Sequence, residues 1–353
     1  MGFNTKKILI ISEYLNPPYD EGIKRTVFQL YQTFDQHYDY IQAICRKGPE
    51  NVRNIKAIDT NRLFLSVKLR KCIKSFSPDL IIYFPFASST FAGFLRHFIL
   101  TRYHAAANNL MIALQPKPLK NWQRHAVKCI KPLTVLTPSP LLKQQLEAMG
   151  INTVLIPLIT DLTVFKPLDT RERKKTLRAK YGISLDAFVV THVGHLNHGR
   201  NLTSLMPLQT AHVQVVIVGS SSTPEDAIGP ASLKAELENK GAIILDRFIE
   251  RIEEIYQLSD LYVFPVEDQN SSIGMPLSIL EARACGIPVL TTDFGGVKQF
   301  LDDDFGGIYY SKPEDFVQAV KKIQEKDTSE FIKTAVSKLN KRFYQIIQRA
   351  IEY

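Results

Sequence analysis

The chain alternates short apolar runs with amphipathic segments, and it does so twice. The first half contains the runs KKILIIS, YIQAI, DLIIYF, NLMIAL and PLTVLT, and the second half contains AFVVTHVGHL, VQVVIVGSS, AIILD, LYVFPV and PVLTTD. Strands that are apolar throughout and separated by helices belong to parallel sheets that are covered on both faces. The pattern therefore predicts an α/β protein with two doubly wound, Rossmann-like domains that face each other across a cleft.

Helical periodicity fills the spaces between these runs. The predicted helices cover Thr26–Phe34, Leu63–Phe76, Leu141–Met149, Leu202–Leu208, Ala231–Lys240, Arg251–Leu258 and Leu277–Cys285. A segment rich in proline and charge, residues 151–175, is expected to link the domains. We predict an N-terminal domain at residues 1–165, a C-terminal domain at 166–330, and a final helix at 331–353 that packs back on the first domain. Ligands of such sheets bind beyond the carboxyl ends of the strands.

Bulk composition narrows the class of protein. The 353 residues suit about two domains, and no run approaches the roughly 18 apolar residues that cross a bilayer. The four cysteines have no CxxC spacing, so we expect a reducing, cytoplasmic location and neither a zinc site nor disulfides. Residues 1–165 contain 21 Lys and Arg against 10 Asp and Glu, and the remainder contains 23 against 25. The basic half suits anionic lipid, nucleic acid, an acidic substrate or simply a solvated surface.

One loop combines a glycine with the start of a helix. In FPVEDQNSSIGMPLSILEARACGIPV a strand ends near Pro265, and a polar loop leads through Gly274 to a helix that Pro276 opens. The exposed N–H groups and the positive dipole end at a helix start attract phosphate. Glu281 follows about one turn later, where its carboxylate can accept hydrogen bonds from a ribose diol, unless it is merely a solvated helix residue.

Two further loops have related chemistry. HVGHLNHGRNL places Gly194 after a strand and Arg200 near a helix start, and the guanidinium of Arg200 offers a planar fork of donors to a diphosphate. YLNPPYDEGIKR places Gly22 before the first helix, where a glycine lets the backbone approach a ligand closely. Each loop alone is a weak signal, but their joint positions favour a phosphate-containing ligand.

These segments resemble the retaining GT-B glycosyltransferases of the family-4 type. The matching words are SPLLKQQLEAMGI, VFKP, VGHLNHGRNL, YQLSDLYVFP and PLSILEARACGIPVLTTDFGG. The resemblance is dense between about Thr137 and Gly307 and thin over the first 130 residues. It implies two Rossmann-like domains and an enzyme that moves a sugar, a hexose by preference, from a nucleotide-diphosphate sugar to a hydroxyl acceptor with retention of configuration.

The resemblance also implies roles for residues at matching positions. Glu281 is expected to hold the nucleotide ribose, and Arg200 occupies the place of a diphosphate-binding lysine. Gly22 lies in the glycine loop of the acceptor domain, and Arg247 with Phe248 borders the base. The remaining donor-binding positions are Gly194, His195, Gly274, Met275, Pro276 and Leu277.

The sequence departs from the family pattern at three positions. The family usually has two glutamates eight positions apart, and Ile273 replaces the first, which contacts the donor sugar. Our hypothesis is that Glu267 or Asp268 reaches the sugar instead, or that the sugar needs no such contact. His195 replaces an arginine of the diphosphate site, and the histidine expected after DLIIYF is missing from FPFASST. The catalytic power that remains would come from positioning and from positive charge near the leaving diphosphate.

Two further patterns concern a metal ion and a membrane. His192, His195 and His198 have a spacing that invites a metal, but strand and turn geometry would scatter the three rings. We expect no metal and no cofactor besides the nucleotide-sugar co-substrate. The sequence KLRKCIKSF, residues 68–76, predicts a basic helix. This helix either rests on the inner face of an anionic membrane or packs its apolar side into the core.

Competing functions follow from the same features. The favoured function is the glycosyltransferase, with a glycan, a lipid-linked compound or a small molecule as acceptor. The alternatives are a catalytically weakened or inactive relative that binds a nucleotide sugar or serves as a partner subunit, and an epimerase of the same fold. A nucleic-acid binder is disfavoured because clustered aromatic and basic faces are missing. A dinucleotide oxidoreductase is disfavoured because no GxGxxG follows either first strand.

Overall fold

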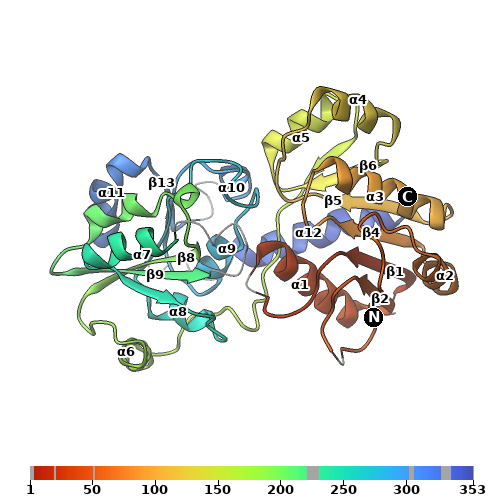
Figure 1. Cartoon of the computed structure of the whole chain (residues 1–353). Helices are drawn as coiled ribbons and strands as arrows, with labels where there is room; N and C mark the ends of the chain where they lie inside the picture. The colour runs from red at the N-terminus through yellow and green to blue at the C-terminus, as the bar shows by residue number, and fades with distance from the viewer. Residues whose placement is uncertain are drawn as a thin grey trace. The chain divides into compact units, whose positions relative to one another are not determined.

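The computed structural model describes residues 4–19, 21–50, 52–220, 230–301, 306–326 and 335–352. The chain divides into two compact units, Met1–Leu158 with Lys341–Tyr353, and Ile159–Asn340. Each unit contains one fully parallel sheet (Figure 1). The expected class, two Rossmann-like α/β domains, is confirmed. Within the described ranges, no helix has both the length and the apolar content needed to cross a bilayer.

The first unit has a seven-stranded sheet in the order β3-β2-β1-β4-β5-β6-β7. Its strands are β1 (Asn4–Ser12), β2 (Tyr38–Cys45), β3 (Ile55–Ala57), β4 (Leu80–Phe84), β5 (Asn108–Ile112), β6 (Thr134–Thr137) and β7 (Thr153–Leu155). Its helices are α1 (Gly22–His37), α2 (Val67–Phe76), α3 (Phe91–Tyr103), α4 (Asn121–Cys129) and α5 (Pro140–Glu147). The central strands are buried because helices cover both faces, as the uniformly apolar runs predicted.

The second unit has a six-stranded sheet in the order β10-β9-β8-β11-β12-β13. Its strands are β8 (Phe188–His195), β9 (Val213–Ser220), β10 (Ile243–Asp246), β11 (Leu261–Phe264), β12 (Val289–Thr291) and β13 (Ile308–Tyr310). Its helices are α6 (Arg171–Lys180), α7 (Pro230–Asn239), α8 (Glu253–Leu258), α9 (Leu277–Ala284), α10 (Val297–Phe300) and α11 (Phe316–Gln324), with 3-10 turns at His198–Arg200, Leu202–Leu208 and Pro313–Asp315.

The strand order positions the site of the second unit. The chain leaves β8 towards β9 on one side, and returns to add β11 on the other side of β8. This reversal creates a switch point beyond the carboxyl ends of β8 and β11, where ligands of open α/β sheets bind. The loops that the sequence analysis selected, after Gly194 and before Gly274, leave these two strands.

The boundary between the two units, after Leu158, falls within residues 151–175, the segment predicted as the link. This segment also includes β7 and the start of α6. The region predicted as one long helix from Leu63 begins only at Val67, where the Ser66 hydroxyl accepts a hydrogen bond from Leu69 N. The last helix, α12 (Ala335–Glu352), contacts α1 through the rings of Tyr344 and Phe34, whose centroids are 6.4 Å apart.

Candidate functional site

The loops after β8 and β11 meet at the switch point of the second sheet. Asn201 Nδ2 donates a hydrogen bond to Pro265 O at 3.3 Å. Gly199 lies so close to Ser271 that a Cβ on the glycine would approach Ser271 Oγ to 2.2 Å. Two loops about 70 residues apart in sequence are therefore in contact, and they contain the predicted residues Arg200, Gly274, Met275 and Pro276.

Arg200 is the cation of this surface. Its side chain is 8% exposed, and Nη1 donates a hydrogen bond to Ser272 Oγ at 3.3 Å. A Cβ on Gly194 would lie 3.4 Å from the same Nη1, so the missing side chain leaves room for the guanidinium beside the end of β8. A buried guanidinium acts through a lower dielectric than an exposed one, so its attraction for an anion is stronger.

Gly274 is held by a hydrogen bond to the turn that contains Gly295 and Gly296. Gly296 N donates to Gly274 O at 2.7 Å, and Gly295 N donates to Gln269 Oε1 at 3.1 Å. Gly295 has φ +58, and a Cβ there would lie only 2.1 Å from Gly274 O. The predicted cradle, Gly274 to Leu277, is therefore held tightly, and all four residues are buried. Pro276 is the N-cap of α9 and offers no side-chain acceptor to its amides.

Glu281 lies deeper than the sequence suggested. It is only 2% exposed, and Tyr256 Oη donates to its Oε2 at 2.7 Å. Tyr256, from α8, is itself fully buried and makes edge contacts with the rings of Phe165 and Tyr262. The reading of Glu281 as a solvated helix residue is therefore wrong. Its role toward a ribose stays a prediction, and a diol would have to share this carboxylate with Tyr256.

Removal of the Tyr256 hydroxyl tests the importance of that hydrogen bond. We expect Tyr256→Phe to lower the free energy of unfolding by about 1.5–3 kcal/mol, because the hydrogen bond reaches a carboxylate. Tyr262→Phe is the control with neutral partners, since its Oη bonds the Ser278 side chain and reaches Val193 O at a long 3.4 Å, and it should cost about 0.5–1.5 kcal/mol. Urea unfolding of both variants measures the difference, and equal losses would contradict this account of Glu281.

His192 lies beneath the same surface. Its ring is fully buried between the rings of Tyr262 and Phe264, and Nδ1 is 2.9 Å from Val263 O. A carbonyl only accepts, so Nδ1 carries the proton and Nε2 presents a lone pair. Nε2 has no partner among the described residues and would lie 2.9 Å from a Cβ on Gly194. Burial lowers the pKa of His192 to about 3, and the charge of Arg200 acts in the same direction.

The pKa of His192 predicts a loss of stability in acid. The unfolded chain takes up a proton below about pH 6.5, whereas the folded protein stays neutral down to about pH 3. Between these values the unfolded state binds more protons, so stability falls as pH falls. We expect the titration of His192 to lower the free energy of unfolding by about 2 kcal/mol between roughly pH 7 and pH 5. Urea unfolding at both pH values measures it.

The titration of a second histidine has to be separated from that of His192. His97 in the first unit is buried, and burial lowers its pKa to about 4, so it contributes in the same direction. The variant His192→Asn keeps a donor for Val263 O and removes one titrating group. Its loss of stability between the two pH values should be about half that of the parent. An unchanged loss would mean that His192 is not the titrating group.

The other predicted residues occupy different positions. His195 is half-buried and His198 is exposed, so the three rings of the HxxHxxH run differ in burial. No group of three or more His, Cys, Asp or Glu in the described part of the chain is arranged to hold a metal ion. Arg247 and Phe248 follow β10, which β9 separates from β8, and Phe248 is 60% exposed.

The two acids of the longer loop have different surroundings. Asp268 holds the loop together, since Oδ1 accepts from Asn270 N at 3.0 Å and Oδ2 accepts from Ser271 Oγ at 2.9 Å. Glu267 is exposed, and its Oε2 accepts from Asn201 Nδ2 at a long 3.4 Å. Ile273, in the place of the usual first glutamate, is buried. Of the two acids, Glu267 makes fewer hydrogen bonds to the described residues of the chain.

Gly22, predicted to approach the donor, belongs to the first unit. It opens α1, and the Glu21 carboxylate accepts from Ile23 N at 3.1 Å and from Lys24 N at 3.0 Å. An acid of the chain itself thus already caps the amides at this helix start. A phosphate that bound there would have to displace Glu21.

The sequence analysis overlooked Glu13, which follows β1 at the switch point of the first sheet. Its carboxylate is buried, and Oε1 accepts from Arg96 Nη1 at 2.6 Å and from Tyr83 Oη at 3.0 Å. Oε2 accepts from Phe86 N at 2.9 Å. The signal was present, because an acid directly after an apolar first strand lies at the edge where ligands bind. With both oxygens bonded inside the chain, Glu13 orders the ends of β1 and β4.

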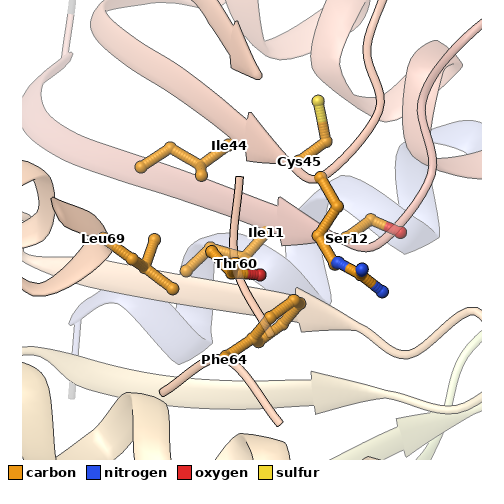
Figure 2. A pocket seen from close by; sticks show the side chains of 8 residues that line it. Ile11, Ser12, Ile44, Cys45, Thr60, Phe64 and Leu69 are labelled. Atoms are coloured by element: carbon orange, nitrogen blue, oxygen red, sulfur yellow. The ribbon is translucent and has the colours of Figure 1, made fainter. Parts of the chain in front are cut away.

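A small pocket lies at the carboxyl ends of β1 and β2, where Ser12 and Cys45 line it (Figure 2). It has no room for a water molecule. The residues labelled in Figure 2 are Ile11, Ser12, Ile44, Cys45, Thr60, Phe64 and Leu69. Most of them belong to the apolar core of the unit, so we interpret the pocket as a packing gap.

Known proteins resemble the part of the chain that contains this site. Residues 187–326 match the model of the glycosyl transferases group 1 family. The putative teichuronic acid biosynthesis glycosyltransferase TuaC of Bacillus subtilis (strain 168) is 28% identical over 170 residues, which are 47% of this chain and 40% of that protein. The chain therefore matches less than half of that relative's own length.

Solved structures resemble the whole chain. A glycosyltransferase from Rickettsia africae ESF-5 has a TM-score of 0.78 at 16% identity and covers 99% of both chains. Anabaena Alr3699/HepE in complex with UDP and glucose has a TM-score of 0.76 at 14% identity, over 99% of this chain and 100% of that chain. The chain therefore has the two-unit GT-B fold, and its residues 187–326 are similar to the group 1 glycosyltransferases.

Proposed function

We propose that this protein is a glycosyltransferase that moves a sugar, a hexose by preference, from a nucleotide-diphosphate sugar to a hydroxyl acceptor with retention of configuration and without a metal ion. The observation that carries the proposal is the junction of Arg200, Ser272 and the Gly274 segment within the matched family domain. The complex of Alr3699/HepE with UDP and glucose supports a nucleotide-sugar donor. The acceptor would be a glycan, a lipid-linked compound or a small molecule.

The proposed chemistry depends on charge and position. A diphosphate that leaves the sugar develops negative charge, and a preorganised cation in a buried site stabilises that charge. Arg200 would supply the cation, and the amides at the start of α9 would supply neutral donors. The acceptor hydroxyl would attack on the face that the diphosphate leaves, so that the diphosphate takes its proton. The chain then mainly holds the two substrates in reacting geometry.

A thermal-shift panel tests the proposal. Nucleoside diphosphates and nucleotide sugars are each added to the full chain, and the compound that raises the melting temperature names the donor. Slow hydrolysis of that donor is then followed without acceptor. Stabilisation with hydrolysis supports the transferase, and no stabilisation even at high ligand concentration would contradict any sugar-nucleotide function.

A second candidate function is a relative that binds a nucleotide sugar without transferring the sugar. Two observations favour it: Ile273 is a buried apolar residue where an acid usually contacts the sugar, and Glu281 is committed to Tyr256. Thermal stabilisation by a nucleotide sugar, with no hydrolysis and no transfer, would favour this candidate.

Replacement of the loop acids tests which one reaches the sugar. We expect Glu267→Ala to lower donor turnover by about 10- to 100-fold without a change in melting temperature, because its one hydrogen bond to the described residues is long. Asp268→Ala should lower the melting temperature as well, because Asp268 holds the loop. Unchanged turnover in both variants would remove the hypothesis that a loop acid replaces the missing glutamate.

A further inference from the structure

The ring of His192 connects β8 to β11 beyond the end of their backbone ladder. The paired residues of these two strands end with Thr191 and Tyr262. One residue further along β8, Nδ1 of His192 lies 2.9 Å from Val263 O of β11. The ring is fully buried and lies near the rings of Tyr262 and Phe264. One nitrogen of this ring is therefore fixed by β11.

The other nitrogen, Nε2, lies near the cation of the candidate site. Residues two apart in a strand point to the same face, so His192 shares its face of β8 with Gly194. A Cβ on Gly194 would lie 2.9 Å from His192 Nε2 and 3.4 Å from Arg200 Nη1. Both nitrogens therefore border the small space that the glycine leaves without a side chain.

The Nε2 atom of His192 is a buried acceptor that needs a donor. It has no hydrogen-bond partner among the described residues. Buried polar atoms nearly always have a partner in native proteins, because an unsatisfied one loses its water without compensation. Burial lowers the pKa of His192 to about 3, so Nε2 keeps its lone pair at neutral pH.

Arg200 is the donor that fits this place. A guanidinium has five N–H groups, so it can serve several acceptors at once. Its Nη1 reaches Ser272 Oγ at a long 3.3 Å, so this bond does not hold the tip of the side chain tightly. A turn of the tip toward the space at Gly194 brings an N–H group to Nε2. Arg200 is also close enough for its charge to oppose a proton on His192.

We infer that His192 is a positioning residue, whose Nε2 accepts a hydrogen bond from the guanidinium of Arg200 and so ties this cation to β11. The inference rests on the proposed function, in which Arg200 binds the diphosphate. A guanidinium that is held from behind keeps its remaining N–H groups in place for an anion. Because His192 is fully buried, it acts on the donor only through Arg200.

Two neutral replacements separate the two nitrogens of the ring. The amide of asparagine occupies the position of Nδ1, whereas the amide of glutamine reaches the position of Nε2. We expect His192→Asn to keep the bond to Val263 O, to lose the bond to Arg200, and to weaken the binding of UDP about tenfold, the value of one hydrogen bond to a charged group. His192→Gln should weaken it less than about threefold. Calorimetric titration measures both, with ADP or GDP in place of UDP where the thermal-shift panel selects one of these.

The stability of the two variants should follow the opposite order. Urea unfolding should show that His192→Gln is the less stable variant, because only asparagine keeps the bond to Val263 O. A purely structural role would give the same order for stability and for UDP affinity. His97→Asn is the control, since His97 is also buried but belongs to the first unit. It should lower the stability and leave the UDP affinity unchanged.

A double-mutant cycle shows whether the effect depends on Arg200. In an Arg200→Ala background the hydrogen bond is already lost, so His192→Asn should weaken UDP binding further by less than about twofold. Nitrogen-15 NMR of the histidine-labelled chain tests the same contact without a nucleotide. The Nε2 resonance of His192, identified by its absence from His192→Asn, should have the frequency of a lone pair that accepts a hydrogen bond. In Arg200→Ala it should move to the frequency of a bare lone pair.

Three results would each overturn the inference. They are an unmoved Nε2 resonance in Arg200→Ala, an equal loss of UDP affinity in both His192 variants, and a full effect of His192→Asn in the Arg200→Ala background. Failure of the proposed function looks different. If the parent chain bound no nucleoside diphosphate, the transferase proposal would fail, whereas the Nε2 resonance would still decide whether Arg200 bonds His192.

Discussion

Replacement of Arg200 by alanine should lower the rate of sugar transfer by about 100- to 1,000-fold, the usual cost of losing one preorganised donor to a developing negative charge. Arg200 is the buried cation at the switch point of the second sheet, and Ser272 fixes its Nη1. Water cannot replace the lost charge easily at a site that the protein already encloses. The rate with saturating donor and the affinity for the nucleoside diphosphate should both be measured.

Two variants control for this prediction. Arg200→Lys keeps the charge but loses the planar fork, so its loss should be smaller than that of alanine. Ser272→Ala removes the hydroxyl that Arg200 Nη1 reaches at 3.3 Å, and should have the smallest effect because the guanidinium itself remains. If Arg200→Ala turned over donor at the parental rate while binding it equally well, Arg200 would not be the cation of the leaving group.

Replacement of Gly295 by alanine should lower the free energy of unfolding by about 3 kcal/mol or more and abolish donor binding. Two costs add at this position. A left-handed φ of +58 is unfavourable for alanine by about 1–2 kcal/mol. In addition, its Cβ would lie 2.1 Å from Gly274 O, a contact that only movement of the backbone can relieve. Such a movement would break the hydrogen bond from Gly296 N and displace the Gly274 segment.

Gly182 is the matched control in the same unit. Its φ is +68, and nothing lies within 4 Å of a Cβ placed there. Gly182→Ala should therefore cost only the conformational part, about 1–2 kcal/mol, and should leave donor binding unchanged. Urea unfolding and the thermal shift with the donor separate the two variants. Similar losses of stability in both would show that the contact with Gly274 is not the cause.

Local patterns failed where an element is short or lacks an apolar stripe. The strands β3, β7 and β13 have three residues each, too few for a period to appear. The helix α4 was missed although its sequence is amphipathic, because its nine residues bury only Val127 and so contain a short and weak apolar stripe. The helix α3 was missed for the opposite reason, because its residues are mostly apolar and show little contrast between faces.

The sequence by itself determined the α/β class, the two sheets and the loops that would form the candidate site, because strand and helix periods are local and because glycine, proline and helix starts mark the strand ends. It also selected Gly194, Arg200 and Gly274. Only the tertiary structure decided that Tyr256 bonds Glu281, that Ser272 fixes Arg200 and that the buried His192 ring bonds Val263 O. Each of these contacts joins residues from different elements, so burial and hydrogen bonding there depend on strand order, which no local pattern contains.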